Sequence, residues 1–119
     1  MSWRRRVLTV EQLLLDPAGH HQHHVRVAGF FRFGREHVAI YPSAREAFQR
    51  RKTRGGSIRG IWLVNPESAR LGVAGLKALN RTTIVVSGTF INRSKAGAGH
   101  FGGWPAELRR ITRIDAVAS

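Results

Sequence analysis

Lysine, histidine and aromatic side chains gather in the glycine-rich segment 93–103 and directly after it. Lys95, His100 and Phe101 stand among glycines, and Trp104 follows them. Glycine permits positive φ, so this backbone can hold a cation and aromatic rings close together on a tight loop. Single-stranded nucleic acid is bound by cations along its phosphates and by aromatic rings against its bases. We therefore interpret the segment as a binding loop.

Part of this segment, GAGHFG at 97–102, matches the G-x-G-x-x-G pattern of dinucleotide-binding sites. Such a site also requires a helix amino terminus at the pyrophosphate, a second parallel strand and an acidic residue about 20 residues further on. Too little sequence follows Gly102 to supply all three. We therefore expect a hairpin tip here and predict no nucleotide cofactor.

The stretch HHQHH at 20–24 holds four of the six histidines. On an extended strand neighbouring side chains point to opposite faces, so only pairs such as His21 and His23 share a face. No nearby carboxylate completes a tetrahedral metal site, and the chain contains no cysteine. The spacing favours a solvated entry to a strand over the alternative of a metal site, and we predict no metal.

The sequence lacks the common catalytic motifs. Its seven acidic residues are spread singly, and neither G-x-S-x-G nor H-E-x-x-H occurs. General acid–base catalysis requires titratable groups that are held close together. We therefore expect a protein that is not an enzyme, and catalysis by His100 is the least favoured of our three functional hypotheses.

Net charge is the strongest signal in the composition. The 119 residues include 20 Lys and Arg, 17 of them Arg, against 7 Asp and Glu, which gives a formal net charge of +13. Such a chain attracts polyanions, of which nucleic acid is the first candidate and an acidic protein the second. The alternative is that an arginine-rich composition reflects coding bias and serves only solubility. The densest basic stretch is the insert 44–57, which contains Arg50, Arg51, Lys52 and Arg54.

The hydrophobic pattern predicts one mainly β domain over residues 1–119, entered through a basic arm at 1–8. A helix is expected over 10–15, because Thr9 and Gln12 have the spacing of a capping box and three leucines follow as core anchors. Gly29 and Gly88 fall in the middle of two of the predicted strands, where a glycine marks a bend or a bulge. Strands are predicted by alternating apolar residues over 25–33, 37–41, 58–64 and 84–91, and a second helix over 69–79.

The tail, 104–119, supports two interpretations. Leu108, Ile111 and Ile114 recur at three-residue spacing, and Pro105 suits the first turn of a helix. Against a helix, Ile111 and Ile114 are β-branched, and a barrel needs a further strand to close. We predict a strand over 108–114, with a helix as the alternative.

The amino-terminal region does not have the pattern of a secretory signal. Its apolar run is interrupted by Glu11 and Asp16, and no run of about 18 apolar residues occurs anywhere in the sequence. We therefore expect a cytoplasmic protein.

Eight short motifs are spaced along nearly the whole chain. They are LLDP at 14–17, VRVAGF at 25–30, AIY at 39–41, IWL at 61–63, LN at 79–80, VSGTF at 86–90, GHFG at 99–102 and ITRI at 111–114. With the order of the predicted elements, these motifs resemble the OB-fold and, more narrowly, a family of small bacterial OB-fold proteins of uncertain function. The resemblance implies a single five-stranded Greek-key barrel with an N-terminal helix and a helix between strands three and four.

The resemblance also implies a binding surface. OB-folds commonly bind oligonucleotides on the face of strands two and three and through the loops that join strands one to two and four to five. In this chain that surface would be flanked by the basic insert and would comprise Arg32, Arg35, Tyr41, Lys95, His100, Phe101 and Trp104.

Two partners follow from this surface. The first is single-stranded nucleic acid, DNA or RNA, bound with weak sequence preference. The alternative is a protein-binding OB module, such as an immunity or adaptor protein, whose basic face binds an acidic protein. Neither hypothesis involves a cofactor or a membrane, and the sequence leaves the oligomeric state open.

Overall fold

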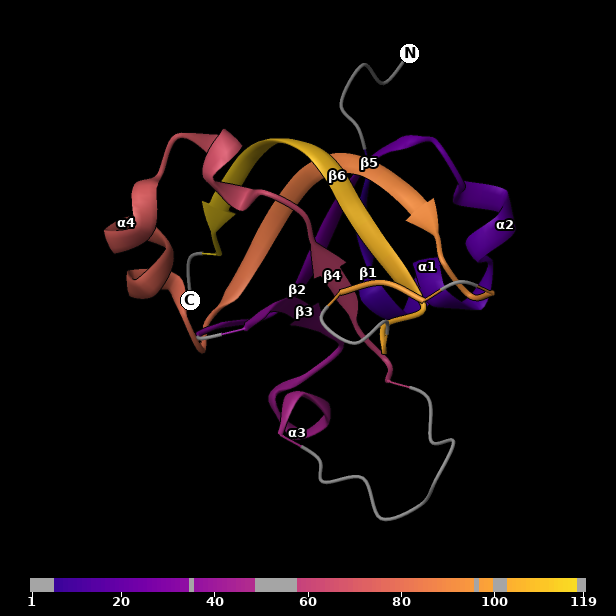
Figure 1. Cartoon of the computed structure of the whole chain (residues 1–119), viewed down its shortest axis with the longest axis horizontal. Coiled ribbons are helices and arrows are strands. Elements are labelled where there is room, and N and C mark those ends of the chain that lie inside the picture. Colours follow the sequence, from indigo (N-terminus) through magenta and orange to yellow (C-terminus); the bar gives the residue numbers. More distant parts are fainter. Residues whose placement is uncertain (1–5, 35, 49–57, 96, 100–102, 118–119) are drawn as a thin grey trace.

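The computed structural model describes residues 6–34, 36–48, 58–95, 97–99 and 103–117, and its strands form one strongly curved sheet (Figure 1). The strands are β1 (Val7–Thr9), β2 (His24–Gly34), β3 (His37–Tyr41), β4 (Ile61–Leu63), β5 (Thr83–Asn92) and β6 (Ala106–Ala116). The helices are α1 (Val10–Leu15), α2 (Pro17–His20), α3 (Ala44–Ala47), the 3-10 helix η1 (Pro66–Ala69) and α4 (Gly72–Leu79). No helix among the described residues is long and apolar enough to cross a membrane.

Five of the strands close into a barrel in the order β2, β3, β4, β6, β5 and back to β2. Neighbouring strands are antiparallel except β4 and β6, which run parallel. This connectivity is that of an OB-like barrel. The predicted fold class is therefore confirmed, with α1 before the first barrel strand and α4 between the third and fourth.

The tail forms the long strand β6, so the helical interpretation of 108–114 is wrong. Leu108 explains why, since it lies opposite Leu63 of β4 on one side and Phe90 of β5 on the other. All three side chains are almost fully buried in the barrel core. Burial against two strands outweighs the local three-residue spacing that favours a helix.

The short strand β1 is an element that the sequence does not predict. It pairs in parallel with β2, with Val7 opposite Arg26 and Thr9 opposite Ala28. Three residues are too few to display an alternating pattern. Two other predicted elements are shorter than expected: the strand at 58–64 is reduced to β4, and the helix at 69–79 is reduced to α4, with η1 ending at Ala69 before it.

The barrel interior is filled by the inward side chains of the strands, and helices cover its two ends. Figure 1 shows α1 and α2 at one end and α4 at the other. Val10 and Leu13 of α1 and Leu76 of α4 are fully buried in this core. The capping box of α1 is confirmed, since the Gln12 amide donates to Thr9 Oγ1 at 3.0 Å and the Thr9 amide donates to Gln12 Oε1 at 2.8 Å. The prediction of three leucine anchors is wrong for Leu15, which is 81% exposed because its position on the helix faces away from the barrel.

The two mid-strand glycines lie where the barrel leaves no room for a side chain. A Cβ at Gly29 would stand 2.9 Å from the Ile40 Cβ, and one at Gly88 would stand 2.9 Å from the Arg109 carbonyl oxygen. Opposite Gly88 the register between β5 and β6 shifts, and Arg110 takes a φ of 50°. The predicted bulge is therefore present, and the extra residues are in β6.

Candidate nucleic-acid interface

OB-folds commonly bind ligands on the face of the second and third barrel strands, which here are β3 and β4, and the outward face of β2 adjoins it. Alternate side chains of each strand point to it, while their neighbours fill the core. Cross-strand pairing brings Phe30 opposite Tyr41, Arg32 opposite Ala39, and Ala39 opposite Trp62. A continuous surface of aromatic and cationic side chains therefore lies across the three strands.

Four rings on this face form what we call the aromatic cluster: His37, Tyr41, Trp62 and Trp104. The Trp62 and Trp104 ring centroids are 4.7 Å apart, and the His37 and Trp104 centroids are 5.5 Å apart. The Tyr41 hydroxyl and His37 Nε2 are hydrogen-bonded at 2.8 Å. These contacts join β3, β4 and the segment before β6 into a second, smaller core.

The aromatic cluster corrects part of the predicted site. Tyr41 is 4% exposed and Trp104 is 8% exposed. Neither ring has a free face on which a base could stack, so their predicted role as a stacking surface is wrong. The reason is that Ala98, Gly99 and Trp104 pack onto the face that the predicted loop was expected to flank.

Gly99 allows that close approach. It has a φ of 73°, and a Cβ on it would stand 2.5 Å from Trp62 Cε3 and 2.7 Å from Trp104 Cε3. The backbones of Ala98 and Trp104 pair on either side of it, with N–H···O distances of 2.8 and 3.0 Å. Lys95, at the start of the segment, is exposed as predicted.

The aromatic cluster is electrically neutral at pH 7. Burial and, to a smaller extent, the positive charge of Arg32 together lower the pKa of His37 to about 4. The Trp104 Nε1 hydrogen is buried and has no acceptor among the described residues. An unpaired buried donor costs about 1–3 kcal/mol, so the packing of the rings must offset that loss.

A second group on the same face, the Phe48 cluster, differs from the aromatic cluster because it contains charged side chains and an exposed ring. It consists of Phe30, Arg32, Phe48 and Arg81. The guanidinium carbons of Arg32 and Arg81 lie 4.6 and 5.0 Å from the centroid of the Phe48 ring, which is 43% exposed. Phe30 supports the ring edge-on at 5.9 Å, and Arg32 also donates to the Ala47 carbonyl oxygen at 2.8 Å.

Sequence reasoning found Arg32 but missed Phe48 and Arg81. Phe48 is a single apolar residue that ends α3 inside a basic stretch, and Arg81 follows α4 much further along the chain. No spacing rule connects the two residues. The one available signal was the combination of an aromatic residue with a basic stretch, which suggests cation–π contacts.

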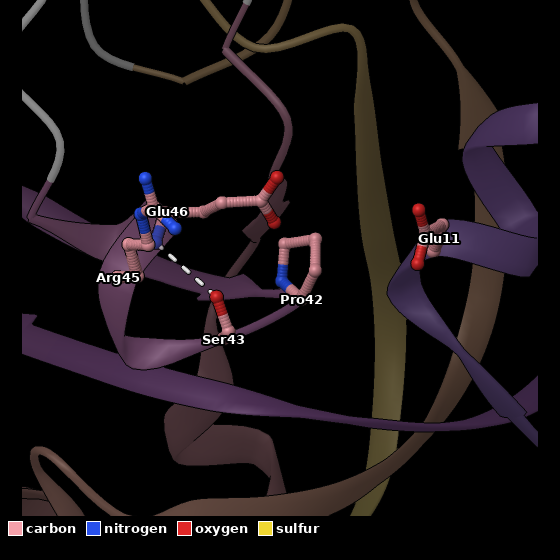
Figure 2. Close-up of a pocket in the computed structure, with 5 residues that line it drawn as sticks. All are labelled: Glu11, Pro42, Ser43, Arg45 and Glu46. Atoms are coloured by element: carbon pink, nitrogen blue, oxygen red, sulfur yellow. Dashed lines mark hydrogen bonds between the residues drawn. The ribbon is translucent and has the colours of Figure 1, made fainter.

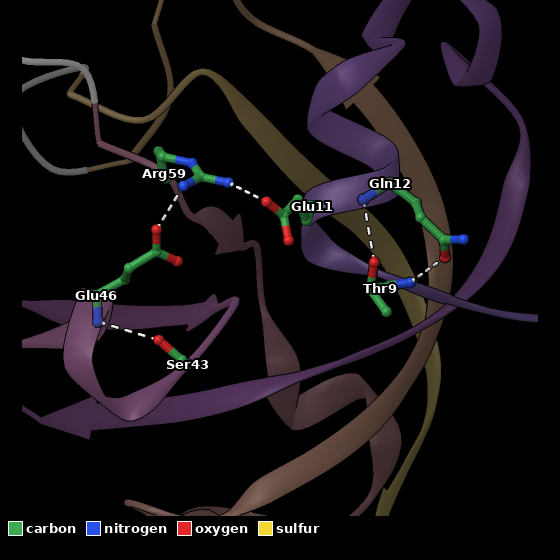
Figure 3. A network of polar contacts seen from close by, with 6 residues as sticks. All are labelled: Thr9, Glu11, Gln12, Ser43, Glu46 and Arg59. Atoms are coloured by element: carbon green, nitrogen blue, oxygen red, sulfur yellow. Dashed lines mark hydrogen bonds and ion pairs between the residues drawn. The ribbon is translucent and has the colours of Figure 1, made fainter.

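The other side of α3 faces a pocket of about 390 Å³, whose lining residues are drawn in Figure 2. Its two acidic residues are tied together by one guanidinium, because Arg59 Nη2 lies 2.7 Å from Glu11 Oε1 and Arg59 Nη1 lies 2.6 Å from Glu46 Oε1 (Figure 3). The hydrogen bond to Glu11 and the charge of Glu46 raise the pKa of Arg59. Two ion pairs of Arg59 therefore link α1 to α3 beside this pocket.

The histidine stretch has separate structural contacts. His21 Nδ1 accepts a hydrogen bond from the Asn92 amide at 2.9 Å, and the His20 ring packs edge-on against Phe90 at 6.4 Å. Across the described ranges, no group of three or more His, Cys, Asp and Glu side chains is placed to hold a metal ion.

The predicted site residues are thus divided by the structure. Arg32 and Lys95 are accessible on the surface, and Tyr41 and Trp104 are buried. The remaining predicted site residues lie outside the described residues: Arg35, Arg50, Arg51, Lys52, Arg54, His100 and Phe101.

Comparison of the sequence with protein-family models and with curated proteins finds no match. The resemblance to small bacterial OB-fold proteins stays a prediction.

Proposed function

We propose that this protein is a non-enzymatic module that binds single-stranded nucleic acid, and that the Phe48 cluster is its main contact. The observation that carries the proposal is an exposed aromatic ring with two guanidinium groups within 5.0 Å of its centroid. The OB-like barrel and the net charge of +13 support the same partner.

The chemistry of this cluster suits bases and phosphates together. Bases stack on Phe48 or on the guanidinium planes of Arg32 and Arg81, and the same arginines attract the neighbouring phosphates. Each stacked base contributes roughly 1–3 kcal/mol of binding free energy, with little preference for one base over another. Weak sequence specificity and strong dependence on salt follow.

The proposal is tested by titrating the protein into a fluorescently labelled single-stranded oligonucleotide and measuring anisotropy at several salt concentrations. We expect log K to fall linearly with log salt, with a slope of about −0.7 for each phosphate contact. Absence of binding at low salt, or binding that does not change with salt, would contradict the proposal.

The covered state of the aromatic cluster favours a second candidate function. Because Ala98 and Trp104 pack onto Tyr41 on the face that OB-folds use for bases, the positive surface around them also suits an acidic protein partner. Capture of partners from the source cell with and without nuclease separates the two candidates. Partners that are lost with nuclease support nucleic-acid binding, and a stoichiometric protein complex that survives nuclease supports the alternative.

A further inference from the structure

A groove of about 540 Å³ lies between β1 and the start of β2, away from the aromatic cluster. Two of its lining residues, Leu8 and Val25, are apolar, and the others are polar or basic. The lining residues are Arg6, Leu8, Gln22, His23, His24, Val25 and Arg26.

The two arginines of this groove both line it, Arg26 from β2 and Arg6 from the residue just before β1. Val7, the neighbour of Arg6 in the chain, lies opposite Arg26 in the pairing of β1 with β2. No acidic residue lines the groove. Among the described residues, no carboxylate lies within 4.0 Å of either guanidinium, whereas Arg59, Arg93, Arg109 and Arg113 all form such pairs.

Strand β2 connects this groove to the Phe48 cluster. Its side chains alternate between core and surface along the whole strand, and Arg26, Phe30 and Arg32 all belong to the outward set. At about 3.3 Å per residue, the Cα atoms of Arg26 and Arg32 are separated by roughly 20 Å or less along the bent strand. A nucleic-acid strand that stacks at Phe48 can therefore follow β2 to the groove.

We propose that Arg6 and Arg26 bind phosphate groups of the same single strand whose bases stack at the Phe48 cluster. This inference rests on the proposed function and adds a second, electrostatic contact to it. Guanidinium groups donate two parallel hydrogen bonds to a phosphate, and two unpaired guanidiniums at one groove present that arrangement without competing carboxylates.

The test compares the double variant Arg6→Ala/Arg26→Ala with a control, Lys77→Ala/Arg70→Asn. The control removes the same charge from exposed residues on and just before α4, and Asn is chosen because Arg70 has a φ of 65°. Each protein is titrated with labelled oligonucleotides of about 4 and about 16 nucleotides, lengths that bracket the usual site size of one OB-fold.

For the 16-nucleotide probe we expect the groove variant to bind roughly tenfold more weakly than the control, with a salt slope shallower by about 1.4, the value for two phosphate contacts. For the 4-nucleotide probe we expect the two variants to bind equally, because the short strand is held at the Phe48 cluster alone. Replacement by lysine, Arg6→Lys/Arg26→Lys, should restore most of the salt slope. That result would show that the alanine variant binds more weakly because it has lost positive charge and not because it has lost its fold.

Equal affinity and equal salt slope of the groove variant and the control on the long probe would overturn the inference, while wild-type binding would leave the proposed function standing. Failure of the wild-type protein to bind either probe would instead overturn the proposed function. Thermal unfolding of each variant identifies any loss of affinity that comes from loss of fold. If the alanine variant is unfolded, the affinity and salt slope of the lysine variant test the inference in its place.

Discussion

The aromatic cluster and the Phe48 cluster lie on the same outward sheet face but differ in how much of their aromatic rings is exposed to solvent. In the aromatic cluster, Tyr41 and Trp104 are at most 8% exposed and the rings contact one another. In the Phe48 cluster, the central ring is 43% exposed, and it is flanked by two arginines and by Phe30 on one edge. An aromatic residue on this face is thus part of a core when other rings and the backbone near Gly99 cover it, and a candidate contact surface when it stays exposed beside cations.

The charges of the two clusters differ for the same reason, namely that one cluster is buried and the other is exposed. Burial keeps His37 neutral at pH 7, so the aromatic cluster carries no charge toward a ligand. Arg32 and Arg81 each contribute a positive charge beside the Phe48 ring, because the guanidinium group is not deprotonated in proteins. The comparison predicts that substitutions in the aromatic cluster change stability, whereas substitutions in the Phe48 cluster change binding.

Substitution Trp104→Ala should have the largest effect on stability. We expect the free energy of unfolding to fall by about 3 kcal/mol, because a large buried ring is removed, partly offset by removal of the unpaired Nε1 donor. Urea denaturation measures this loss. The control Trp104→Phe keeps an aromatic ring without the donor and should lose less, and a loss below about 1 kcal/mol for the alanine variant would mean that the cluster is not a packed core.

Substitution Gly99→Ala tests whether the loop must approach the indoles so closely. The added Cβ would meet Trp62 and Trp104 within 2.7 Å at a positive φ, so we expect a loss of about 2 kcal/mol in unfolding free energy. Gly72→Ala is the matched control, since Gly72 also has a positive φ, of 67°, and a Cβ there meets no atom within 4 Å. Equal stability of the two variants would show that the loop does not depend on contact with the indoles.

The pH dependence of stability tests the burial of His37. The unfolded chain takes up a proton on this residue near pH 6.5, whereas the folded protein does so only near pH 4. The free energy of unfolding should therefore fall by about 1–2 kcal/mol as the pH is lowered from 6.5 to 4, and this contribution should level off below pH 4. The variant His37→Gln should lack this component, and an unchanged pH profile in the variant would contradict the assignment.

The barrel could be predicted because its main constraints are local. Gly29 and Gly88 mark positions where strands approach too closely for a side chain, and the Thr9 and Gln12 spacing is that of the capping box that forms. Alternation along β2 alone identifies which side chains fill the core.

The site could be predicted only in part because its contacts are distant in sequence. The sequence does not distinguish a tyrosine or tryptophan that stacks on a base from one that packs in a core. Tyr41 and Trp104 belong to a core because the backbone around Gly99 packs against the rings. The pairing of Arg81 with Phe48 likewise depends on how α4 and α3 are placed by the barrel. Residue type leads to a hypothesis about the kind of partner, and only the fold distinguishes the open rings from the covered ones.

The affinity of Phe48→Ala for a single-stranded oligonucleotide tests the central claim most directly. Because Phe48 is 43% exposed, the stability of the variant should change by less than about 1 kcal/mol, while its affinity should fall roughly 5- to 150-fold, the contribution of one stacked base. Phe48→Trp should bind at least as tightly as the wild-type protein, since the larger ring still stacks. Unchanged affinity of Phe48→Ala, measured at low salt with the fold intact, would contradict the account.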